Sequence, residues 1–164
     1  MEDEYLFKII EKLSKKLPKF DDGRVNYSKS KIAPIINVFI KYKDKILLLK
    51  RSDKVLAYKE KWNSLGGFLD ELKSIKEKVL EELREELKIN KNLIKSIKLA
   101  KPYKLFDKSI RRTWLIFPAL VELNKMPKIK LDWEHTDFKW IYPEDIKKFD
   151  VVLKLDVSLN KVLK

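Results

Sequence analysis

The chain has 164 residues, enough for one compact domain with a single core, and it contains no cysteine and only one histidine, His135. This composition excludes disulfides, thiolate zinc sites, cysteine nucleophiles and metal sites built from several histidines. The formal charge of +13 is compatible with an anionic partner such as a polyphosphate or a nucleic acid. Only five of the 38 basic residues are arginine, however, and the lysine-rich composition is typical of a thermophile's charged surface.

The sequence predicts no contact with a membrane. Its longest apolar runs, "IAPIINVFI" and "WLIFPALV", are well short of the roughly 18 residues that a membrane span requires, and the acidic start "MEDE" differs from the basic start of a signal peptide. No internal repeat and no Pro/Gly/Ser-rich linker marks a second domain. We therefore expect a soluble cytoplasmic protein with a single domain over residues 1–164, in which residues 1–31 form a helical N-terminal extension.

The first half of the chain predicts a helix, a hairpin and a second helix. Apolar residues in "EYLFKIIEKLSKKL" recur at helical spacing until Pro18 ends the pattern. The runs "APIINVFIKY" and "KILLLKRS", separated by "KDK", predict two strands joined by a tight turn. The paired glycines of "KWNSLGGFLDEL" predict a loop that enters a helix, because Ser74 and Glu77 form a capping box before "IKEKVLEELREELKI".

The second half predicts more strands and then helices. The segments "LIKSIKLAKPYKLF", "RRTWLIFPALVEL" and "FKWIY" are three candidate strands. The segments "PEDIKKF" and "VVLKLDVSLNKVL" return to helical spacing, and Pro143 suits a first helical position. Strands around one central helix, with helices at both ends, predict an α/β or α+β sandwich.

The central helix carries an unusual concentration of carboxylates. Glu82, Glu85 and Glu86 fall within roughly a 100° arc of the helix, beside an apolar stripe. Like charges at this spacing destabilise a helix by a few tenths of a kcal/mol per pair, so they need relief from a lysine such as Lys78 or from a bound cation. Clustered carboxylates suit Mg²⁺ or Mn²⁺. The alternative is a solvated helix face that is laced with lysines and Arg84.

With its paired glycines, the segment "GGFLDELKSIKEKVLEELREEL" resembles the Nudix box, G-x5-E-x7-R-E-U-x-E-E-x-G-U, where U is aliphatic. Counted from Gly67, the chain has Lys73 where the box has its first glutamate, Glu81 where it has arginine and Lys88 where it has its late glycine. The flanks "KILLLKRSDKVLAYKEKWNSLGG" and "LDWEHTDFKWIYPEDI" are similar to the family as well. The resemblance covers roughly residues 32–163.

This resemblance implies a Nudix α/β/α sandwich with a mixed sheet, in which the box loop and helix span residues 66–89. It implies a hydrolase dependent on Mg²⁺ or Mn²⁺ that cleaves the diphosphate linkage of a nucleoside diphosphate attached to another group. It also implies a small nucleotide substrate and is compatible with a homodimer. The altered box leaves an alternative open, namely a catalytically silent Nudix domain that binds nucleotide or RNA, although nucleic acid is the less favoured partner.

The resemblance also implies roles for individual residues. Glu82, Glu85 and Glu86 correspond to metal ligands and catalytic residues, and Glu82 is also able to orient or deprotonate water. The carbonyl of Gly66 corresponds to a backbone ligand of the metal. Glu134 in "DWEHTDF" is the expected additional ligand or general base, ahead of Asp132.

Other residues are weaker candidates for function. Arg111 and Arg112 precede a strand that could cross the substrate cleft, so contacts with phosphate are one interpretation and a solvated turn is the other. His135 stays outside the predicted catalytic set, because a lone histidine is usually a hydrogen-bonding loop residue. Five aromatic residues are candidates to stack on a base, although most are expected in the core: Tyr58, Trp62, Phe106, Trp114 and Trp133.

The departures from the box generate two further predictions. Lys73 and Glu81 reverse the charges of the family pattern, so an ion pair with exchanged polarity is one hypothesis, and independent drift with a solvated Lys73 is the other. Lys88 stands where a glycine would end the helix. We therefore expect the helix to end without a left-handed residue at that position, with Asn90 or Asn92 taking the role of the cap.

Overall fold

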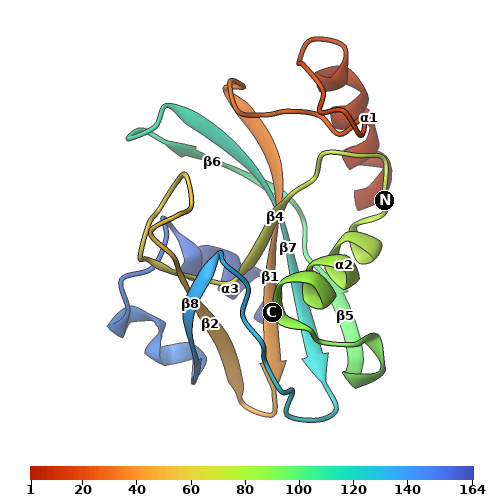
Figure 1. The fold of residues 1–164 in the computed structure, drawn as a ribbon. Coiled ribbons are helices and arrows are strands. Elements are labelled where there is room, and N and C mark those ends of the chain that lie inside the picture. The colour runs from red at the N-terminus through yellow and green to blue at the C-terminus, as the bar shows by residue number, and fades with distance from the viewer.

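A computed structural model describes all residues from 1 to 164 and arranges them around one eight-stranded sheet (Figure 1). The strands are β1 (Ile32–Tyr42), β2 (Lys45–Arg51), β3 (Trp62–Asn63), β4 (Leu65–Phe68), β5 (Ile94–Leu99), β6 (Tyr103–Asp107), β7 (Arg112–Leu123) and β8 (His135–Ile141). The helices are α1 (Glu2–Ser14), α2 (Ile75–Leu87) and α3 (Leu155–Leu163), with 3-10 turns η1 (Lys91–Leu93) and η2 (Pro143–Lys148). None of the helices has the length and apolar character that crossing a bilayer would require.

Strand β1 organises the sheet. It runs parallel to β7 and antiparallel to β4, and at its end it turns into β2, which in turn pairs with β8. The predicted hairpin is confirmed, because Tyr42 lies opposite Lys45 across a two-residue turn in which Lys43 has a φ of 54°. The segment predicted as a single strand before β7 is instead two strands, β5 and β6, which both pair with β7. Pro102, which has no N–H for a strand ladder, lies at the break.

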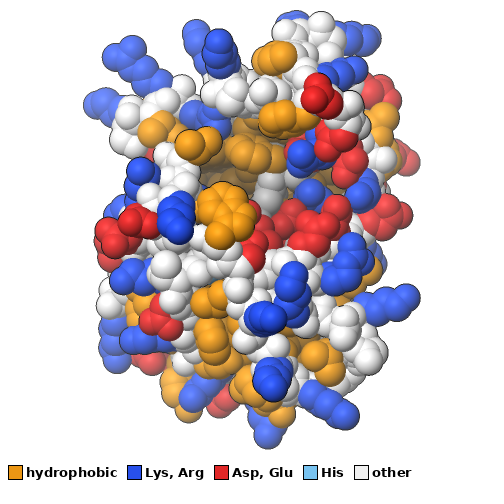
Figure 2. Space-filling model, viewed as in Figure 1, with side chains coloured by type: hydrophobic (Ala, Val, Ile, Leu, Met, Phe, Trp, Pro, Cys, Tyr) orange, Lys and Arg blue, Asp and Glu red, His pale blue; other side chains and the backbone are white.

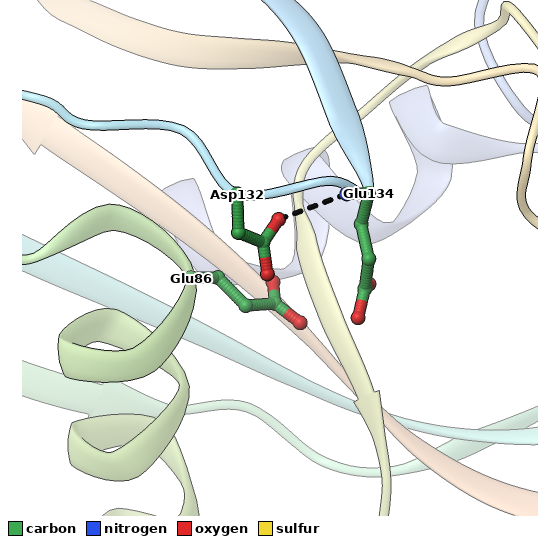
Figure 3. Close-up of side chains that lie close together, drawn as sticks. All are labelled: Glu86, Asp132 and Glu134. Carbon is green, nitrogen blue, oxygen red and sulfur yellow. Dashed lines mark hydrogen bonds between the residues drawn. The ribbon is translucent and has the colours of Figure 1, made fainter.

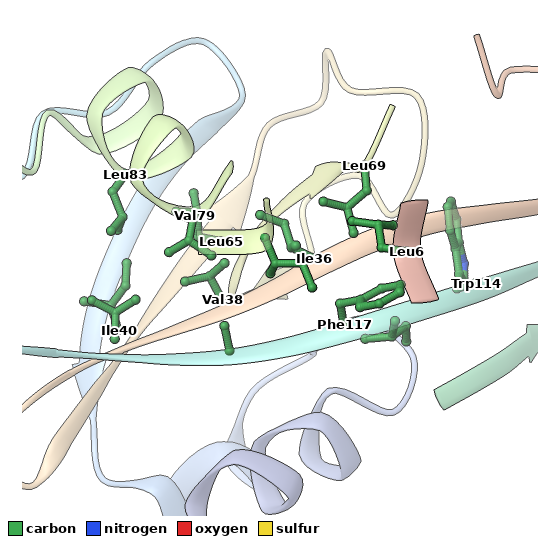
Figure 4. Close-up of a cluster of buried hydrophobic side chains, with 14 of the residues drawn as sticks. Leu6, Ile36, Val38, Ile40, Leu65, Leu69, Val79, Leu83, Trp114 and Phe117 are labelled. Carbon is green, nitrogen blue, oxygen red and sulfur yellow. The ribbon is translucent and has the colours of Figure 1, made fainter. Parts of the chain in front are cut away.

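Two layers of helix cover the sheet, as Figure 4 shows with α2 on one face and α3 on the other. Because side chains alternate along a strand, Ile36, Val38 and Ile40 of β1 point into the cluster that Val79 and Leu83 of α2 complete. The opposite face buries a second cluster with α3: Phe39, Ile46, Leu48, Leu120, Ile141, Leu155 and Leu159. The predicted α/β/α sandwich with a mixed sheet is therefore confirmed.

The predicted N-terminal helix is present and packs on the domain. Leu6 and Ile10 of α1 lie in the same buried cluster as the apolar stripe of α2. The side chain of Asp3 accepts a hydrogen bond of 2.9 Å from the backbone N–H of Ile75, the first residue of α2. The predicted cap of α2 also forms, because Ser74 Oγ accepts from the N–H of Glu77 at 3.2 Å. Helix α1 thus contributes directly to the start of the carboxylate helix.

The end of α2 contradicts our prediction for Lys88. This residue adopts the left-handed conformation, with φ 58° and ψ 34°, in spite of its side chain. The N–H of Ile89 bonds to the carbonyl of Leu83 at 3.0 Å, and the N–H of Lys88 bonds to that of Arg84 at 3.2 Å. These bonds and the burial of Ile89 offset the roughly 1–2 kcal/mol that a non-glycine residue pays in this conformation.

The contact between α1 and α2 is testable by the substitution Asp3→Ala. Removing the carboxylate leaves the N–H of Ile75 without its partner at a positive helix end, so we expect the free energy of unfolding to fall by about 0.5–2 kcal/mol. Denaturant unfolding measures this change. Glu4→Ala is the matched control, because Glu4 is exposed in the same turn of α1. Equal losses in the two variants would contradict a specific role for Asp3.

Candidate active site

Helix α2 buries two adjacent stripes of side chains rather than one. The apolar stripe faces the sheet, and beside it lie Lys78, Glu82 and Glu86, spaced four residues apart. These three charged residues are only 8%, 7% and 6% exposed. Since burying a charge is costly unless it is paired or bound to a metal, the interpretation of a solvated glutamate face is wrong for Glu82 and Glu86. The helix directs this charge into the protein.

Three carboxylates converge at the inner end of this stripe. Glu86 points from α2 toward Asp132 and Glu134, which lie in the turn before β8, and one oxygen from each residue lies within 4.8 Å of the others (Figure 3). The turn is ordered by two hydrogen bonds. Asp132 Oδ1 accepts from the N–H of Glu134 at 3.0 Å, and the Glu134 carbonyl accepts from the N–H of Ser52 at 2.8 Å. The start of β8 is thereby fixed against the segment that follows β2.

The electrostatics of this cluster favour a bound cation. Glu86 Oε2 is buried and has no hydrogen-bond partner. Burial and the neighbouring carboxylates of Glu82, Glu134 and Asp132 raise the pKa of Glu86 far above its ordinary value. Burial and Asp132 likewise raise the pKa of Glu134. An all-oxygen donor set with an unpartnered buried oxygen fits a hard divalent cation, which would allow these groups to ionise together.

Glu82 lies beside the cluster but has different partners. Its Oε1 is 3.1 Å from Lys78 Nζ, and the backbone of Gly67 in β4 closes the other side. A Cβ at Gly67 would come within 2.8 Å of Glu82 Oε1, so this close approach requires glycine. Gly66 precedes it in β4, opposite Asn37 of β1. The role of its carbonyl as a ligand stays a prediction.

Glu85 lies outside this arrangement. The residue is exposed, and it is not among the three clustered carboxylates. Its backbone carbonyl accepts a hydrogen bond of 2.9 Å from the side chain of Lys88 at the exposed end of the helix. The structure therefore brings together Glu86, Glu134 and Asp132 of the predicted site residues, with Glu82 beside them. Metal binding by Glu85 stays a prediction.

The hypothesis of an ion pair with exchanged polarity is confirmed as a contact. Lys73 Nζ lies 3.0 Å from Glu81 Oε2, and it lies 3.0 Å from Glu71 Oε1 as well. The loop before α2 therefore folds back along the helix. Hydrogen bonds to Glu81 and Glu71 raise the pKa of Lys73. Burial opposes ionisation of Glu81, but its bond with Lys73 and nearby positive charges leave its pKa lowered.

The two predicted substrate arginines differ in their surroundings. Arg111 is exposed in a turn, where its φ is 51°. The guanidinium of Arg112 instead donates to three backbone carbonyls, those of Tyr27 at 2.7 Å, Ser28 at 3.0 Å and Ser30 at 3.2 Å. Arg112 thereby fastens the segment before β1 to the start of β7. Contacts of either arginine with substrate stay predictions.

Sequence reasoning missed Arg51, the last residue of β2. Its Nε donates to the carbonyl of Ala57 at 3.0 Å. Burial lowers the pKa of Arg51, although the nearby charges of Glu134 and Glu86 oppose this effect. The arginine is therefore close to the carboxylate cluster, opposite His135 in the pairing of β2 with β8. One basic residue among 38 gives no signal until that pairing is known.

His135 is buried in a position that suits a neutral side chain. Burial lowers its pKa to about 4, so the imidazole is uncharged at neutral pH. Its Nδ1 lies 3.7 Å from Asp132 Oδ1 and forms no hydrogen bond. The structure gives His135 no contact that would bring it into the predicted catalytic set.

A hollow lined by hydrophobic side chains lies above the acidic band in Figure 2. Phe68 follows the paired glycines and is 41% exposed, with ring centroids 5.8 Å from Tyr27 and 6.3 Å from Trp114. Trp114 is buried, as expected of a core residue. Tyr58 and Trp62 pack partly buried against the core clusters, whereas Phe106 and Trp133 are 58% and 62% exposed, so most of the five aromatic residues belong to the core as expected. Two of the exposed rings adjoin site residues along the chain, because Phe68 follows Gly67 and Trp133 lies between Asp132 and Glu134.

The pair of Lys73 and Glu81 can be tested with a double-mutant cycle. Because both side chains are partly exposed, at 31% and 22%, we expect Lys73→Ala and Glu81→Ala to couple by about 0.5–1 kcal/mol in the free energy of unfolding. The control cycle combines Glu81→Ala with Lys76→Ala, since Lys76 is an exposed lysine of the same helix. Additive effects of the first cycle would show that the contact contributes nothing.

The raised pKa of Glu86 predicts a pH dependence of stability. Above its ordinary value of 4.5, the folded protein holds a proton that the unfolded chain has released, so stability falls as pH rises. The slope is at most about 1.4 kcal/mol per pH unit for one such group. Between about pH 7.5 and 8.5, His135 contributes little to this slope, because with a pKa of about 4 in the folded protein and 6.5 in the unfolded chain it is mostly neutral in both states.

Thermal unfolding with EDTA and with Mg²⁺ measures this effect. We expect the melting temperature to fall with pH in EDTA and to depend less on pH in Mg²⁺, because the ion compensates the carboxylates. Glu86→Gln should remove most of the slope. A flat profile in EDTA would contradict the proton held by the cluster.

Comparisons with known proteins place this geometry in a family. The family model described as the NUDIX domain matches residues 31–161. A MutT NUDIX hydrolase from Burkholderia pseudomallei has a similar structure, with a TM-score of 0.67 and 21% identity, over 81% of this chain and 99% of that one. An Ap4A hydrolase from C. elegans, solved as a binary complex, gives 0.61 and 21%, over 79% and 93%.

The NUDIX domain of Shewanella oneidensis NrtR, complexed with ADP ribose, gives a TM-score of 0.64 at 18% identity, over 80% of this chain and 88% of that one. No curated protein matches the sequence. Structural likeness at such low identity shows a common fold and no more. The family model, however, spans most of the chain, and the protein therefore belongs to the NUDIX domain family.

Proposed function

We propose that the protein is a divalent-metal-dependent Nudix hydrolase that cleaves the diphosphate linkage of a nucleoside diphosphate attached to another group. The observation that carries this proposal is the convergence of Glu86, Asp132 and Glu134, with a buried Glu86 oxygen that has no partner. A buried polar atom without a partner costs about 1–3 kcal/mol, and more when it is charged. A bound cation would supply the missing partner and offset this cost.

The cation proposed for this site is Mg²⁺ or Mn²⁺. Glu86, Asp132 and Glu134 would hold it, and the resemblance adds the Gly66 carbonyl, Glu82 and Glu85 to the proposed ligands. When bound, such an ion neutralises phosphate oxygens and polarises the phosphorus centre for attack by water. The residues present supply the oxygen ligands that these ions prefer.

The protein's own groups then position the water and the substrate. The water oxygen forms a bond to one phosphorus while the bridging P–O bond breaks, and the bridging oxygen leaves with the other phosphate. A carboxylate takes the proton that the water loses, and Glu82, held between Lys78 and Gly67, is the proposed acceptor, with Glu134 as the alternative. Arg51, near the cluster, is placed to donate to phosphate oxygens.

The substrate class that fits is a small nucleotide. Phe68 and Trp133 offer exposed ring faces near the carboxylates, and stacking on a base is the usual use of such rings. The similar structures named for Ap4A hydrolysis and for an ADP ribose complex support the same class, since both compounds contain a diphosphate attached to a nucleoside. Contacts of Arg111 and Arg112 with the phosphates are part of this proposal.

Hydrolysis assays with Mg²⁺ or Mn²⁺ test the proposal directly. Purified protein is incubated with a panel of nucleoside diphosphate derivatives, and the products are separated by chromatography. We expect turnover of at least one compound, and a loss of at least about 100-fold in kcat/KM in Glu86→Gln, because the altered side chain no longer holds the ion. Glu77→Gln is the matched control, since Glu77 is an exposed glutamate of the same helix.

Two further results sharpen the interpretation. A larger loss in Asp132→Asn than in Glu85→Gln would assign the third carboxylate ligand to the turn before β8 rather than to the exposed end of α2. If no compound is turned over while nucleotide or RNA binds in a salt-sensitive manner, the proposal fails in favour of a domain that only binds.

A further inference from the structure

The guanidinium of Arg51 is held by the protein at one nitrogen only. Its Nε donates to the carbonyl of Ala57 at 3.0 Å, whereas neither terminal nitrogen forms a hydrogen bond or an ion pair with the protein. Strand alternation places Arg51 on the face of the sheet that α2 covers, because Leu49 belongs to the cluster on that face. The next residue, Ser52, donates to the carbonyl of Glu134 at 2.8 Å. Two donor nitrogens close to the carboxylate cluster therefore remain available to a phosphate.

The loop between β2 and β3, residues 52–61, folds around Arg51 in an unfavourable conformation. Tyr58 and Glu60 have φ angles of 54° and 62°, which residues other than glycine rarely adopt. The carbonyl of Arg51 accepts from the N–H of Glu60 at 3.0 Å, and its N–H donates to the carbonyl of Lys61 at 2.9 Å. Strained residues persist only where surrounding contacts fix them, so the loop needs an attachment to the rest of the protein.

The hydroxyl of Tyr58 provides this attachment. It donates to the carboxylate of Asp107 at the end of β6 and accepts from Nε1 of Trp114 in β7 at 3.0 Å. Burial alone would raise the pKa of Asp107, but hydrogen bonds from Ser109 and Tyr58 leave it lowered. The acceptor is therefore charged, and hydrogen bonds to charged groups are stronger than neutral ones. The loop is thereby tied to the β6–β7 hairpin, which it approaches in Figure 1.

This attachment lies one residue from the acceptor that orients Arg51. Ala57, whose carbonyl binds Nε of Arg51, directly precedes Tyr58. A displacement of Tyr58 therefore moves that carbonyl as well. The half-buried hydroxyl of Tyr103 differs in this respect, because it pairs with Ser158 of α3 and belongs to a contact on the other face of the sheet.

We propose that Tyr58 is a positioning residue for substrate binding. Its hydrogen bond with Asp107 fixes the β2–β3 loop, and the carbonyl of Ala57 then orients Arg51 so that both terminal nitrogens meet the diphosphate beside the carboxylate cluster. This inference rests on the proposed function. It deepens that function by assigning to a loop outside the Nudix box the orientation of the group that binds the diphosphate, while the carboxylates hold the cation.

The proposal predicts separate effects on diphosphate and metal. Tyr58→Phe removes the hydroxyl and keeps the ring, so Arg51 must be ordered when the diphosphate binds, and affinity should fall by about fivefold. KM should rise by more than kcat falls, because a fixed Arg51 contacts phosphate before as well as during the reaction. Mn²⁺ affinity should change by less than about twofold, since none of the three clustered carboxylates belongs to the loop.

Binding is measured without turnover by calorimetric titration with the methylene analogue of ADP, whose P–C–P bridge resists hydrolysis, in the presence of Mg²⁺. The proteins compared are the wild type, Tyr58→Phe and Tyr103→Phe, a control that removes a tyrosine hydrogen bond on the other face. We expect weaker binding only in Tyr58→Phe. Equal affinity in wild type and Tyr58→Phe, or an equal loss in Tyr103→Phe, would overturn the proposal.

A titration of the same proteins with Mn²⁺ alone, followed by the electron paramagnetic resonance signal of the free ion, separates positioning from a general loss of structure. Unchanged Mn²⁺ affinity in Tyr58→Phe is the expected result. A loss of Mn²⁺ affinity as large as the loss of diphosphate affinity would count against the proposal. If Tyr58→Phe does not fold, Asp107→Asn takes its place, because it removes the charged acceptor of the same hydrogen bond.

Two further measurements test the individual links. In an Arg51→Met background, Tyr58→Phe should change affinity for the analogue by less than about twofold, because the role of Tyr58 acts through Arg51. Trypsin should cleave the loop faster in Tyr58→Phe than in wild type, at the exposed Lys54 or Lys59, and no faster in Tyr103→Phe. A full fivefold effect without Arg51, or equal cleavage of wild type and Tyr58→Phe, would overturn the proposal.

These measurements also distinguish the two proposals from each other. Weaker binding of the analogue in Tyr58→Phe, together with no hydrolysis of any compound, would retain the role of Tyr58 and reject the hydrolase. Hydrolysis with the same KM in wild type and Tyr58→Phe would retain the hydrolase and reject the role of Tyr58. A wild-type protein that does not bind the analogue would overturn the role of Tyr58, whereas the hydrolase is judged by turnover alone.

Discussion

The structure depends on the repulsion among carboxylates that are buried together at the inner face of α2. Glu86, Asp132 and Glu134 approach one another within a few ångströms, and Glu82 lies next to them, in a position that water reaches poorly. Carboxylates this close and this buried cannot all ionise without positive charge. The chain supplies some of that charge through Lys78 and Arg51. The remainder must come from protons or from a cation, and this requirement supports the proposed metal site.

The rest of the fold holds these mutually repelling carboxylates close together. Strand β1 pairs with β4, which presents the backbone of Gly67 to Glu82, and it leads into β2, whose pairing with β8 positions the turn that carries Asp132 and Glu134. Helix α2 is fixed in register by its apolar stripe and by its contacts with α1 at the first turn. Repulsion among the carboxylates is therefore opposed by a sheet and two helices with a shared core, and the site cannot relax by moving one element.

Local sequence patterns predicted the main elements around the site. The position of α2 followed from its apolar period and its capping box, and the hairpin of β1 and β2 followed from two apolar runs around a short polar turn. Spacing also identified Glu82 and Glu86 as neighbours on one face. Periodicity could not show which edge of that face turns inward, because packing against the sheet decides this, and Glu85 lies on the exposed edge.

The features that sequence could not supply are those that depend on contacts between distant residues. Arg51 is close to the carboxylates only because β2 pairs with β8. Lys88 adopts the left-handed conformation because the burial of the next residue, Ile89, compensates its energetic cost. Local propensity alone disfavours this conformation for a lysine. The exposure of Phe106 and Trp133 likewise depends on where β6 and the turn before β8 end relative to the rest of the sheet.

The altered Nudix box is best understood as a rearranged set of charges. The family pattern places arginine directly before the glutamate that corresponds to Glu82, whereas this chain has Glu81 there. Lys73 Nζ, in the loop before α2, lies 3.0 Å from Glu81 Oε2. Lys78 Nζ, one helical turn before Glu82, lies 3.1 Å from Glu82 Oε1. The first contact joins the two substituted positions of the box, and the second joins two residues within the helix. The exchanged residues at positions 73 and 81 thus remain paired, and the buried Glu82 has a positive partner in its own helix.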